Sequence, residues 1–105
     1  MKSDNEYIEK IIKDINYIIE KMEGVDYDSF VLNTILQDAM MFRLIQISES
    51  AKLLSDEYKS KSDIPWNSIS GLRNRIVHDY GNVDLTVVFD TLIDDIPKVK
   101  EGLGC

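Results

Sequence analysis

Cysteine is almost absent from this sequence: of its 105 residues only Cys105, at the very end, carries a thiol. A single cysteine cannot form a disulfide within the chain, so no disulfide framework supports the fold. Such usage is typical of proteins in a reducing compartment. A prenylation signal is also excluded, because it requires the cysteine to stand fourth from the end.

Long apolar stretches are missing as well. No run of about 18 or more apolar residues is present, so no membrane span is predicted. Residues 1–6 are polar where a secretory signal requires an apolar segment. We therefore expect a cytoplasmic protein that does not contact a membrane.

Basic residues are in short supply. The chain has 12 lysine and arginine residues against 19 aspartate and glutamate residues, and its net charge is −7. This balance argues against broad electrostatic binding to nucleic acid. The acidic residues are unevenly distributed, however: residues 68–78 contain Arg73, Arg75 and His78 and no carboxylate. The sequence therefore allows a local basic site on an acidic protein.

What is present is the composition of an ordinary globular protein, with 44% hydrophobic and 30% charged residues. Residues 1–105 are expected to form one helical domain, since this length is common for a single domain. Such a chain can bury one core but not a large cofactor cavity in addition. No cofactor is expected, and an active site should lie on a surface, in a groove or at a subunit interface.

Apolar residues recur at three- and four-residue steps in the first half of the chain. They predict a helix over residues 4–22, ended by Gly24. After Asp26 or Asp28, either of which suits an N-cap, the absence of proline and glycine predicts one long helix over residues 29–58. Its broad apolar face, wide enough to contact two neighbours, includes Phe30, Val31, Ile35, Leu36, Ala39, Phe42, Ile45, Ala51 and Leu54.

Two further helices are predicted in the second half. One opens at Pro65, a residue suited to the first helical position, and runs to His78 or Asp79. Gly71 inside it marks either a kink or a close approach of another helix. The last helix begins after Asp84 and should kink or restart near Pro97. Four helices with short connections predict an all-α, up-and-down four-helix bundle.

The sole histidine, His78, lies in the third of these helices, and histidine is the residue type suited to proton transfer near neutral pH. At 100° per residue, Ile69, Leu72 and Ile76 define the core side, and His78 points roughly opposite with Asn74 one turn behind it. One interpretation is an exposed or capping histidine near a helix end. The other is a general acid or base, with Asn74 beside it and Arg73 holding a phosphate.

Other candidates favour structural roles. Asp94 and Asp95 diverge by about 100° on a helix and no histidine or cysteine joins them, so no metal site is predicted. Arg43 and Glu49 are expected to form ion pairs. Trp66 is expected to anchor the core rather than stack on a base.

The spacing Arg73-Asn74-(x3)-His78-x-Tyr80 resembles the Arg-x4-His-x-Tyr motif of the HepT-like toxins, a branch of the HEPN-domain ribonucleases. The resemblance covers nearly all of the chain. It includes residues 64–66, 71–74, 83–84 and 94–97, and Arg43 followed by residues 47–51. In this last segment Ser48 and Ser50 stand where the family pattern leads us to expect glycine and alanine.

This resemblance implies a HEPN-like bundle and a metal-independent endoribonuclease toxin. Its partner would be a minimal nucleotidyltransferase antitoxin of the MntA kind, which silences such toxins by adenylylating the motif tyrosine. Carried over by residue, Arg73 and His78 would be catalytic, Asn74 and Arg75 would support RNA binding, and Tyr80 would be modified.

The chemistry favours a homodimer independently. Cleaving RNA without metal requires one proton removed from the 2′-hydroxyl and another delivered to the leaving oxygen, and one histidine cannot easily do both beside a permanently charged arginine. Two facing copies would supply two His78 and two Arg73 to one composite site. The alternative is a non-catalytic helical module that docks a nucleotidyltransferase or binds nucleotide, which the net charge of −7 favours.

Overall fold

The computed structural model describes residues 3–61 and 63–104, so the expectations about Cys105 and about residues 1–2 lie outside it. The described part of the chain consists of helices, turns and short connections without a strand, which confirms the predicted all-α class. Within these ranges, no helix combines the length and the apolar character needed to span a bilayer.

The first helix, α1, spans Asp4–Met22, as predicted. Its stripe of isoleucines is the reason that it packs: Ile11, Ile15 and Ile18 are wholly buried. Gly24 follows the helix with a φ of 73°, a left-handed conformation that glycine adopts without strain.

The predicted single helix over residues 29–58 is wrong, because the structure divides this segment into three. They are α2 (Tyr27–Leu32), α3 (Thr34–Lys52) and α4 (Asp56–Ser60). Asn33 leaves the helical conformation, and its side chain accepts a hydrogen bond from the Leu36 amide at 3.0 Å. Ser55 caps α4 in the same way. These side chains satisfy amides at each new helix start, so the chain breaks without proline or glycine.

Of the two candidate N-caps for this region, Asp26 is the one used, since its carboxylate accepts the Ser29 amide at 2.8 Å. That hydrogen bond holds the pKa of Asp26 below its ordinary value. The predicted apolar face of the segment is buried only in part. Phe30 is wholly buried, whereas Ile35 and Phe42 are 84% and 54% exposed.

The second half begins with α5 (Trp66–His78), a short turn η1 (Tyr80–Asn82) and α6 (Leu85–Asp90). Pro65 stands just before α5 as its N-cap, one position earlier than predicted. Asp84 caps α6 as predicted, accepting the Thr86 amide at 2.9 Å.

The last helical rod changes pitch where a kink was predicted. Between α6 and α7 (Ile96–Gly102) lies η2 (Thr91–Asp95), a π-helical stretch that ends two residues before Pro97. Proline lacks an amide hydrogen and its ring clashes with the carbonyl four residues earlier. A wider π turn relieves both constraints without stopping the helix.

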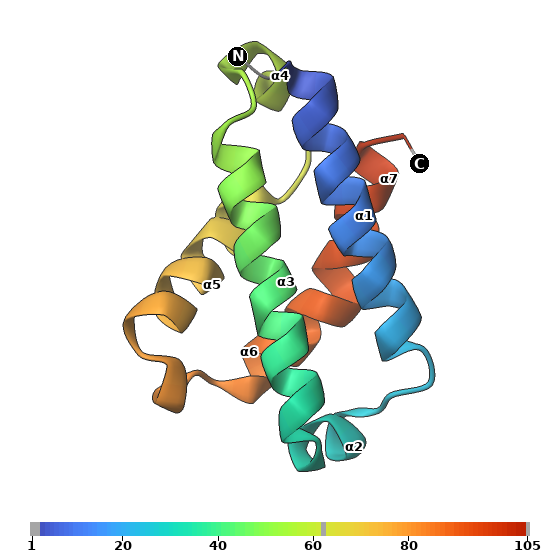
Figure 1. The fold of residues 1–105 in the computed structure, drawn as a ribbon, viewed down its shortest axis with the longest axis vertical. Coiled ribbons are helices and arrows are strands. Elements are labelled where there is room, and N and C mark those ends of the chain that lie inside the picture. The colour runs from blue at the N-terminus through green and yellow to red at the C-terminus, as the bar shows by residue number, and fades with distance from the viewer. Residues whose placement is uncertain (1–2, 62, 105) are drawn as a thin grey trace.

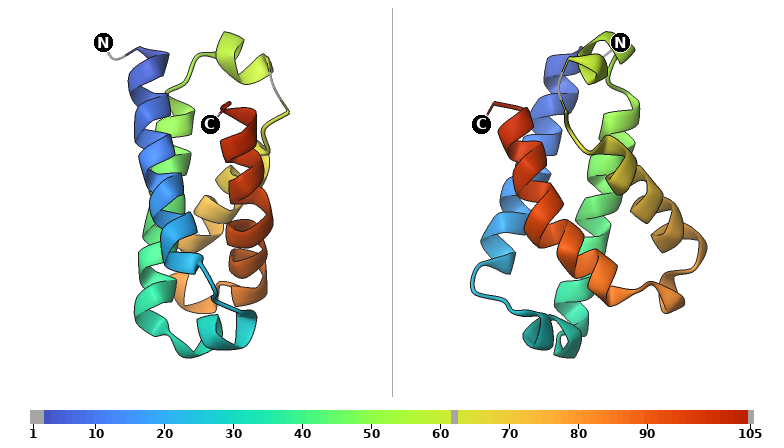
Figure 2. Two further views of the ribbon diagram at one scale, coloured as in Figure 1. Left: turned by 90° about the vertical axis from the view of Figure 1, so that its right-hand side faces the viewer. Right: turned by 180° about the vertical axis from the view of Figure 1, so that it is seen from behind.

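The four rods α1, α3, α5 and α6–η2–α7 alternate in direction along the chain, as the predicted up-and-down bundle requires (Figure 1). Helices α1 and α3 lie side by side, and the last rod packs behind them (Figure 2). Helix α5 packs on α3 and on η2 at one flank, and the turn after it projects from the bundle.

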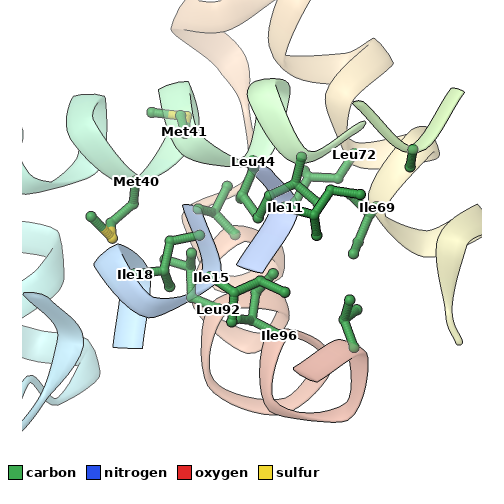
Figure 3. Close-up of a cluster of buried hydrophobic side chains, with 14 of the residues drawn as sticks. Ile11, Ile15, Ile18, Met40, Met41, Leu44, Ile69, Leu72, Leu92 and Ile96 are labelled. Carbon is green, nitrogen blue, oxygen red and sulfur yellow. The ribbon is translucent and has the colours of Figure 1, made fainter. Parts of the chain in front are cut away.

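All four rods contribute to one core (Figure 3). Its buried side chains include Ile11, Ile15, Ile18, Met40, Met41, Leu44, Ile69, Leu72, Leu92 and Ile96. Trp66 packs against this cluster, as expected for a core anchor. A buried ion pair also ties α1 to α3: Asp14, only 3% exposed, accepts from Arg43 at 2.8 Å. The ion pair predicted for Arg43 is confirmed.

Candidate functional site

The site is built on the sides of α5 that do not face the core. Ile69, Leu72 and Ile76 are buried, as the helical spacing predicts. Asn74 and His78 are exposed on the opposite side, so the predicted orientation of both is confirmed. His78 is also the last residue of α5, because Asp79 leaves the helix with φ −153° and ψ 61°.

Arg73 lies at the edge of α5 that faces α3. Its guanidinium forms an ion pair with Glu49, with 2.7 Å between Nη2 and Oε1, and its Nη1 donates to the Asn74 side-chain oxygen at 3.1 Å. The Arg73 side chain is 21% exposed. Glu49 was predicted to form an ion pair, and this is confirmed with Arg73 as its partner. The contact fixes the orientation of Arg73.

Asn74, Arg75 and His78 share a pocket of about 460 Å³ where α5, the η1 turn and α6 meet. Leu72, Asp79, Asn82, Val83, Asp84 and Val87 complete its lining. Asn74 therefore links two parts of the site: its side-chain oxygen holds Arg73, and the residue also borders the pocket beside His78.

The Tyr80 side chain lies against α3, away from the pocket beside His78. Its hydroxyl donates a hydrogen bond to the carboxylate of Asp38 on α3. Partial burial, this hydrogen bond and the negative charge of Asp38 raise the pKa of Tyr80 to about 12. The ring remains 47% exposed, so the phenol is accessible from solvent but is held as a neutral donor.

Within one chain the motif residues are therefore divided into two groups. Arg73 and His78 are five positions apart and point about 140° away from each other around the helix. Among residues 3–61 and 63–104, no hydrogen bond joins them, and each has its own surroundings. The pocket collects Asn74, Arg75 and His78, while Arg73 and Tyr80 contact α3.

Sequence reasoning missed Asp38 and the apolar lining formed by Val83 and Val87. Asp38 stands 42 residues before its partner Tyr80, and no local spacing connects the two. Val83 and Val87 flank the Asp84 cap, so their approach to His78 depends on how the η1 turn folds back. The predicted N-cap at Asp84 located the end of this turn along the chain but not its approach to α5.

In the part of the chain that the structure describes, no three histidine, aspartate or glutamate side chains lie close enough together to hold a metal ion. Asp94 and Asp95 border a separate groove between α5 and η2, together with Arg75.

An all-helical bundle with an Arg-x4-His-x-Tyr segment at the end of an exposed helix defines a HEPN-type protein. Comparison with protein-family models agrees: residues 6–104 match the family described as Ribonuclease HepT-like. The chain belongs to this family of ribonucleases.

Proteins with ribonuclease names are similar to this chain over most of its length. A Caldanaerobacter subterraneus protein provisionally named an RNase is 30% identical over 102 residues, which is 96% of this chain and 91% of that protein. A Thermococcus cleftensis protein provisionally named ribonuclease HepT is 29% identical over 100 residues, covering 94% and 91%. A Methanocaldococcus jannaschii protein, also provisionally named an RNase, is 27% identical over 96 residues, covering 90% and 88%. No solved structure matches the chain significantly.

Proposed function

We propose that this ribonuclease is the toxin of a toxin–antitoxin pair. It cleaves RNA without metal at a composite site on a homodimer interface, using Arg73 and His78, and it is silenced by adenylylation of Tyr80. The observation that carries the proposal is the orientation of α5, which turns Asn74 and His78 away from the core and beside an open pocket.

The composite site answers a difficulty in the single chain. Cleavage requires a base for the 2′-hydroxyl, an acid for the leaving 5′-oxygen and a cation for the charged phosphorane. One chain offers one histidine, and Arg73 points away from it. In a twofold dimer that pairs the exposed sides of α5, one His78 acts as base and the other as acid, while the N–H groups of Arg73 that Glu49 leaves free face the phosphorane from the edge of the paired helices.

The exposed side of α5 suits such a dimer. Asn67, Gly71, Asn74 and His78 follow one another along it at helical spacing, and all four are exposed. A Cβ added at Gly71 meets nothing within 4 Å. Helix α5 continues through Gly71, and among the described residues no other helix of this chain approaches Gly71 closely. A glycine on an open helical face destabilises the helix by roughly 1 kcal/mol, which close approach of a second copy would offset.

Arg73 and three nearby residues, Glu49, Arg75 and Asn74, have different roles in binding RNA. Glu49 keeps the Arg73 guanidinium in one orientation while leaving N–H groups for a phosphate oxygen. Arg75, exposed at the pocket, supplies a second positive charge for the RNA backbone. Asn74 positions Arg73 through its side-chain oxygen.

Tyr80 is accessible enough to be modified by a partner enzyme. Adenylylation replaces the hydroxyl proton with a phosphodiester, so Tyr80 can no longer donate to Asp38. The added negative charge would lie beside the Asp38 carboxylate and would be repelled by it. We therefore expect modification to displace the η1 turn next to His78 and to repel the RNA phosphate.

The partner in this scheme is a minimal nucleotidyltransferase antitoxin of the MntA kind, acting in the cytoplasm. The alternative function is a non-catalytic helical module that docks the nucleotidyltransferase or binds nucleotide. The net charge of −7 favours this alternative, because it opposes RNA binding.

The central test is cleavage of RNA by purified protein in EDTA. We expect wild type to cut and both His78→Ala and Arg73→Ala to lose at least about a hundredfold in rate. Lys13→Ala, which removes an exposed charge on α1, is the matched control and should retain activity. Equal cleavage by wild type and His78→Ala would contradict the catalytic role of His78, and no cleavage by wild type would favour the non-catalytic alternative.

The silencing step is tested by intact mass after co-expression with a nucleotidyltransferase encoded beside the gene. Wild type should gain one or more adenylate units and lose RNase activity, and Tyr80→Phe should gain none and remain active. An unmodified toxin held inactive in a tight complex would show silencing by occlusion instead.

A further inference from the structure

The pocket beside His78 has two kinds of wall. Leu72, Val83 and Val87 form an apolar wall, and Leu72 belongs to the core itself. Polar side chains form the rest, from Asn74, Arg75, His78, Asp79, Asn82 and Asp84. At about 460 Å³ the pocket is within the range of roughly 300–1,000 Å³ that small-molecule sites occupy. An apolar wall facing a ring of polar groups suits a flat heteroaromatic ligand.

The polar groups of the pocket have unused hydrogen-bonding capacity, and apart from Arg75 and His78 most of it lies on acceptor oxygens. One carboxylate oxygen of Asp79 accepts from the side-chain amide nitrogen of Asn82 at 2.9 Å. One carboxylate oxygen of Asp84 accepts from the backbone amide of Thr86. Among the described residues, nothing donates to the second oxygen of either carboxylate or to the Asn82 side-chain oxygen. The donors available are Arg75, His78 and the side-chain amide nitrogens of Asn74 and Asn82.

The distribution of charge orients an RNA nucleotide in this pocket. Two carboxylates, Asp79 and Asp84, repel a phosphate from the interior. Arg75 and His78 attract it to their side of the pocket. A neutral base therefore enters against the apolar wall while its phosphate stays near His78, which the composite site requires.

We propose that this pocket is a base-recognition subsite that prefers guanine at the nucleotide next to the cleaved phosphate. The Watson–Crick edge of guanine presents the N1–H and N2 amino donors side by side, with the O6 acceptor adjacent. Acceptors from Asp79, Asp84 and Asn82 match the two donors, and the Asn74 amide nitrogen matches O6. Uracil offers only one donor, between two acceptors, and therefore fits less well than guanine.

The inference deepens the proposed function, since a base subsite beside His78 has a role in cleavage only if His78 is catalytic. Binding, however, can be measured without cleavage. The first experiment titrates the full chain with GMP, AMP, CMP, UMP and ribose 5-phosphate while amide chemical shifts are followed. GMP should shift amides of residues 72–87 and bind at least about tenfold more tightly than UMP, as one good pair of hydrogen bonds predicts.

A substitution that keeps the shape of the side chain and removes one negative charge makes the test specific. Asp79→Asn keeps an acceptor for Asn82 but replaces the free carboxylate oxygen with a donor, so GMP should bind about tenfold more weakly while UMP binding is retained. Asp28→Asn, the same change at an exposed position on α2, is the matched control and should bind as wild type. Asn82→Ala, which removes a second acceptor at an exposed turn, should weaken GMP binding as well.

The outcomes separate this inference from the proposed function. Equal binding of all four nucleotides, or shifts confined to amides outside residues 72–87, would overturn the guanine subsite. Cleavage of RNA by wild type with no base preference, unchanged in Asp79→Asn, would overturn it while leaving the ribonuclease assignment intact. Guanine-selective binding by a protein that cuts no RNA would instead support the subsite and contradict the catalytic roles of Arg73 and His78.

Discussion

At the scale of single residues, Tyr80 and Asp38 form the contact with the clearest chemical consequence. The phenol donates to a carboxylate across two helical segments, and this arrangement stabilises the neutral phenol over the phenolate. The Tyr80 hydroxyl is thereby held in one place without being ionised, which suits the modification that we propose for it. Its reactivity then depends on a base that removes the proton during attack, and Asp38 is already in contact with that proton.

The raised pKa of Tyr80 can be measured directly. In Asp38→Asn the side chain keeps its shape but loses its charge, so the pKa of Tyr80 should fall from about 12 toward its ordinary value of 10.0. Near-ultraviolet titration of phenolate absorbance reports this shift, with Tyr80→Phe subtracted to remove the other tyrosines. An unchanged titration in Asp38→Asn would mean that burial alone controls the phenol.

The same shift predicts a dependence of stability on pH. The folded state binds the Tyr80 proton more tightly than the unfolded state, so this contribution to stability is complete below pH 10 and is lost as the pH rises to about 12. Chemical denaturation of wild type and Tyr80→Phe across this window should show wild type losing stability faster. Parallel curves for the two proteins would contradict the assignment.

Residue-scale features were predictable where they depend on one helix. The orientation of Ile76, Asn74 and His78 follows from 100° steps, and the structure agrees. The contact of Asp38 with Tyr80 was not predictable, because it depends on how the η1 turn packs against a helix 42 residues earlier. The partner of Glu49 was hidden for the same reason.

At the scale of elements, the ion pair of Asp14 with Arg43 joins the two longest helices. Asp14 is almost wholly buried, and Lys10 approaches its second oxygen at 3.3 Å. Arg43 in turn lies over the Tyr17 ring, 3.9 Å from its centroid. A buried carboxylate with two cationic neighbours is costly to leave unpaired.

Removing one partner of this pair should therefore destabilise the fold. Arg43→Met should lower the free energy of unfolding by about 3 kcal/mol, because Asp14 loses its closest counter-charge. The double variant Asp14→Leu/Arg43→Met should recover most of that loss, and Lys61→Met, from an exposed pair with Glu57, should change little. Denaturant titration gives these values; equal stability of Arg43→Met and wild type would show that Lys10 alone compensates Asp14.

Helix α5 offers a separate prediction about subunit contact. The Cβ of a residue at position 71 meets nothing within its own chain, so Gly71→Leu should fold normally. If the exposed sides of α5 pair, the added side chain should separate them, converting dimer to monomer and removing RNase activity. Light scattering and circular dichroism measure both, with Lys13→Leu on α1 as the control. A dimeric Gly71→Leu would place the interface elsewhere.

The boundaries of elements show where sequence patterns fail. The limits of α1 and the N-cap of α6 were predicted because Gly24 and Asp84 are strong local signals. The breaks around α3 were not predicted: asparagine and serine are favoured N-cap residues, but without a glycine or proline nothing local separated Asn33 and Ser55 from the other polar residues of the segment. The exposed side chains of Ile35 and Phe42 explain the misleading periodicity: the apolar face is real, but this chain alone does not cover all of it.

At the scale of the whole molecule, an acidic chain must hold a polyanion. Arg73 and Arg75 are both on α5, and a twofold dimer through this helix would bring four arginines into one region. The remaining surface stays acidic and repels RNA. Loss of the dimer should therefore weaken RNA binding more than loss of either arginine alone. This difference distinguishes a composite site from two independent ones.

Subunit mixing tests that distinction. If each site needs both copies of His78, a dimer of one wild-type and one His78→Ala subunit is inactive. After exchange at equal concentrations, about a quarter of the dimers are wholly wild type, so activity should fall to about one quarter of that of the same total protein as wild type. Independent sites would leave about one half. A mixture with Lys13→Ala controls for losses during exchange, and activity at one half would show that a single His78 suffices for each cut.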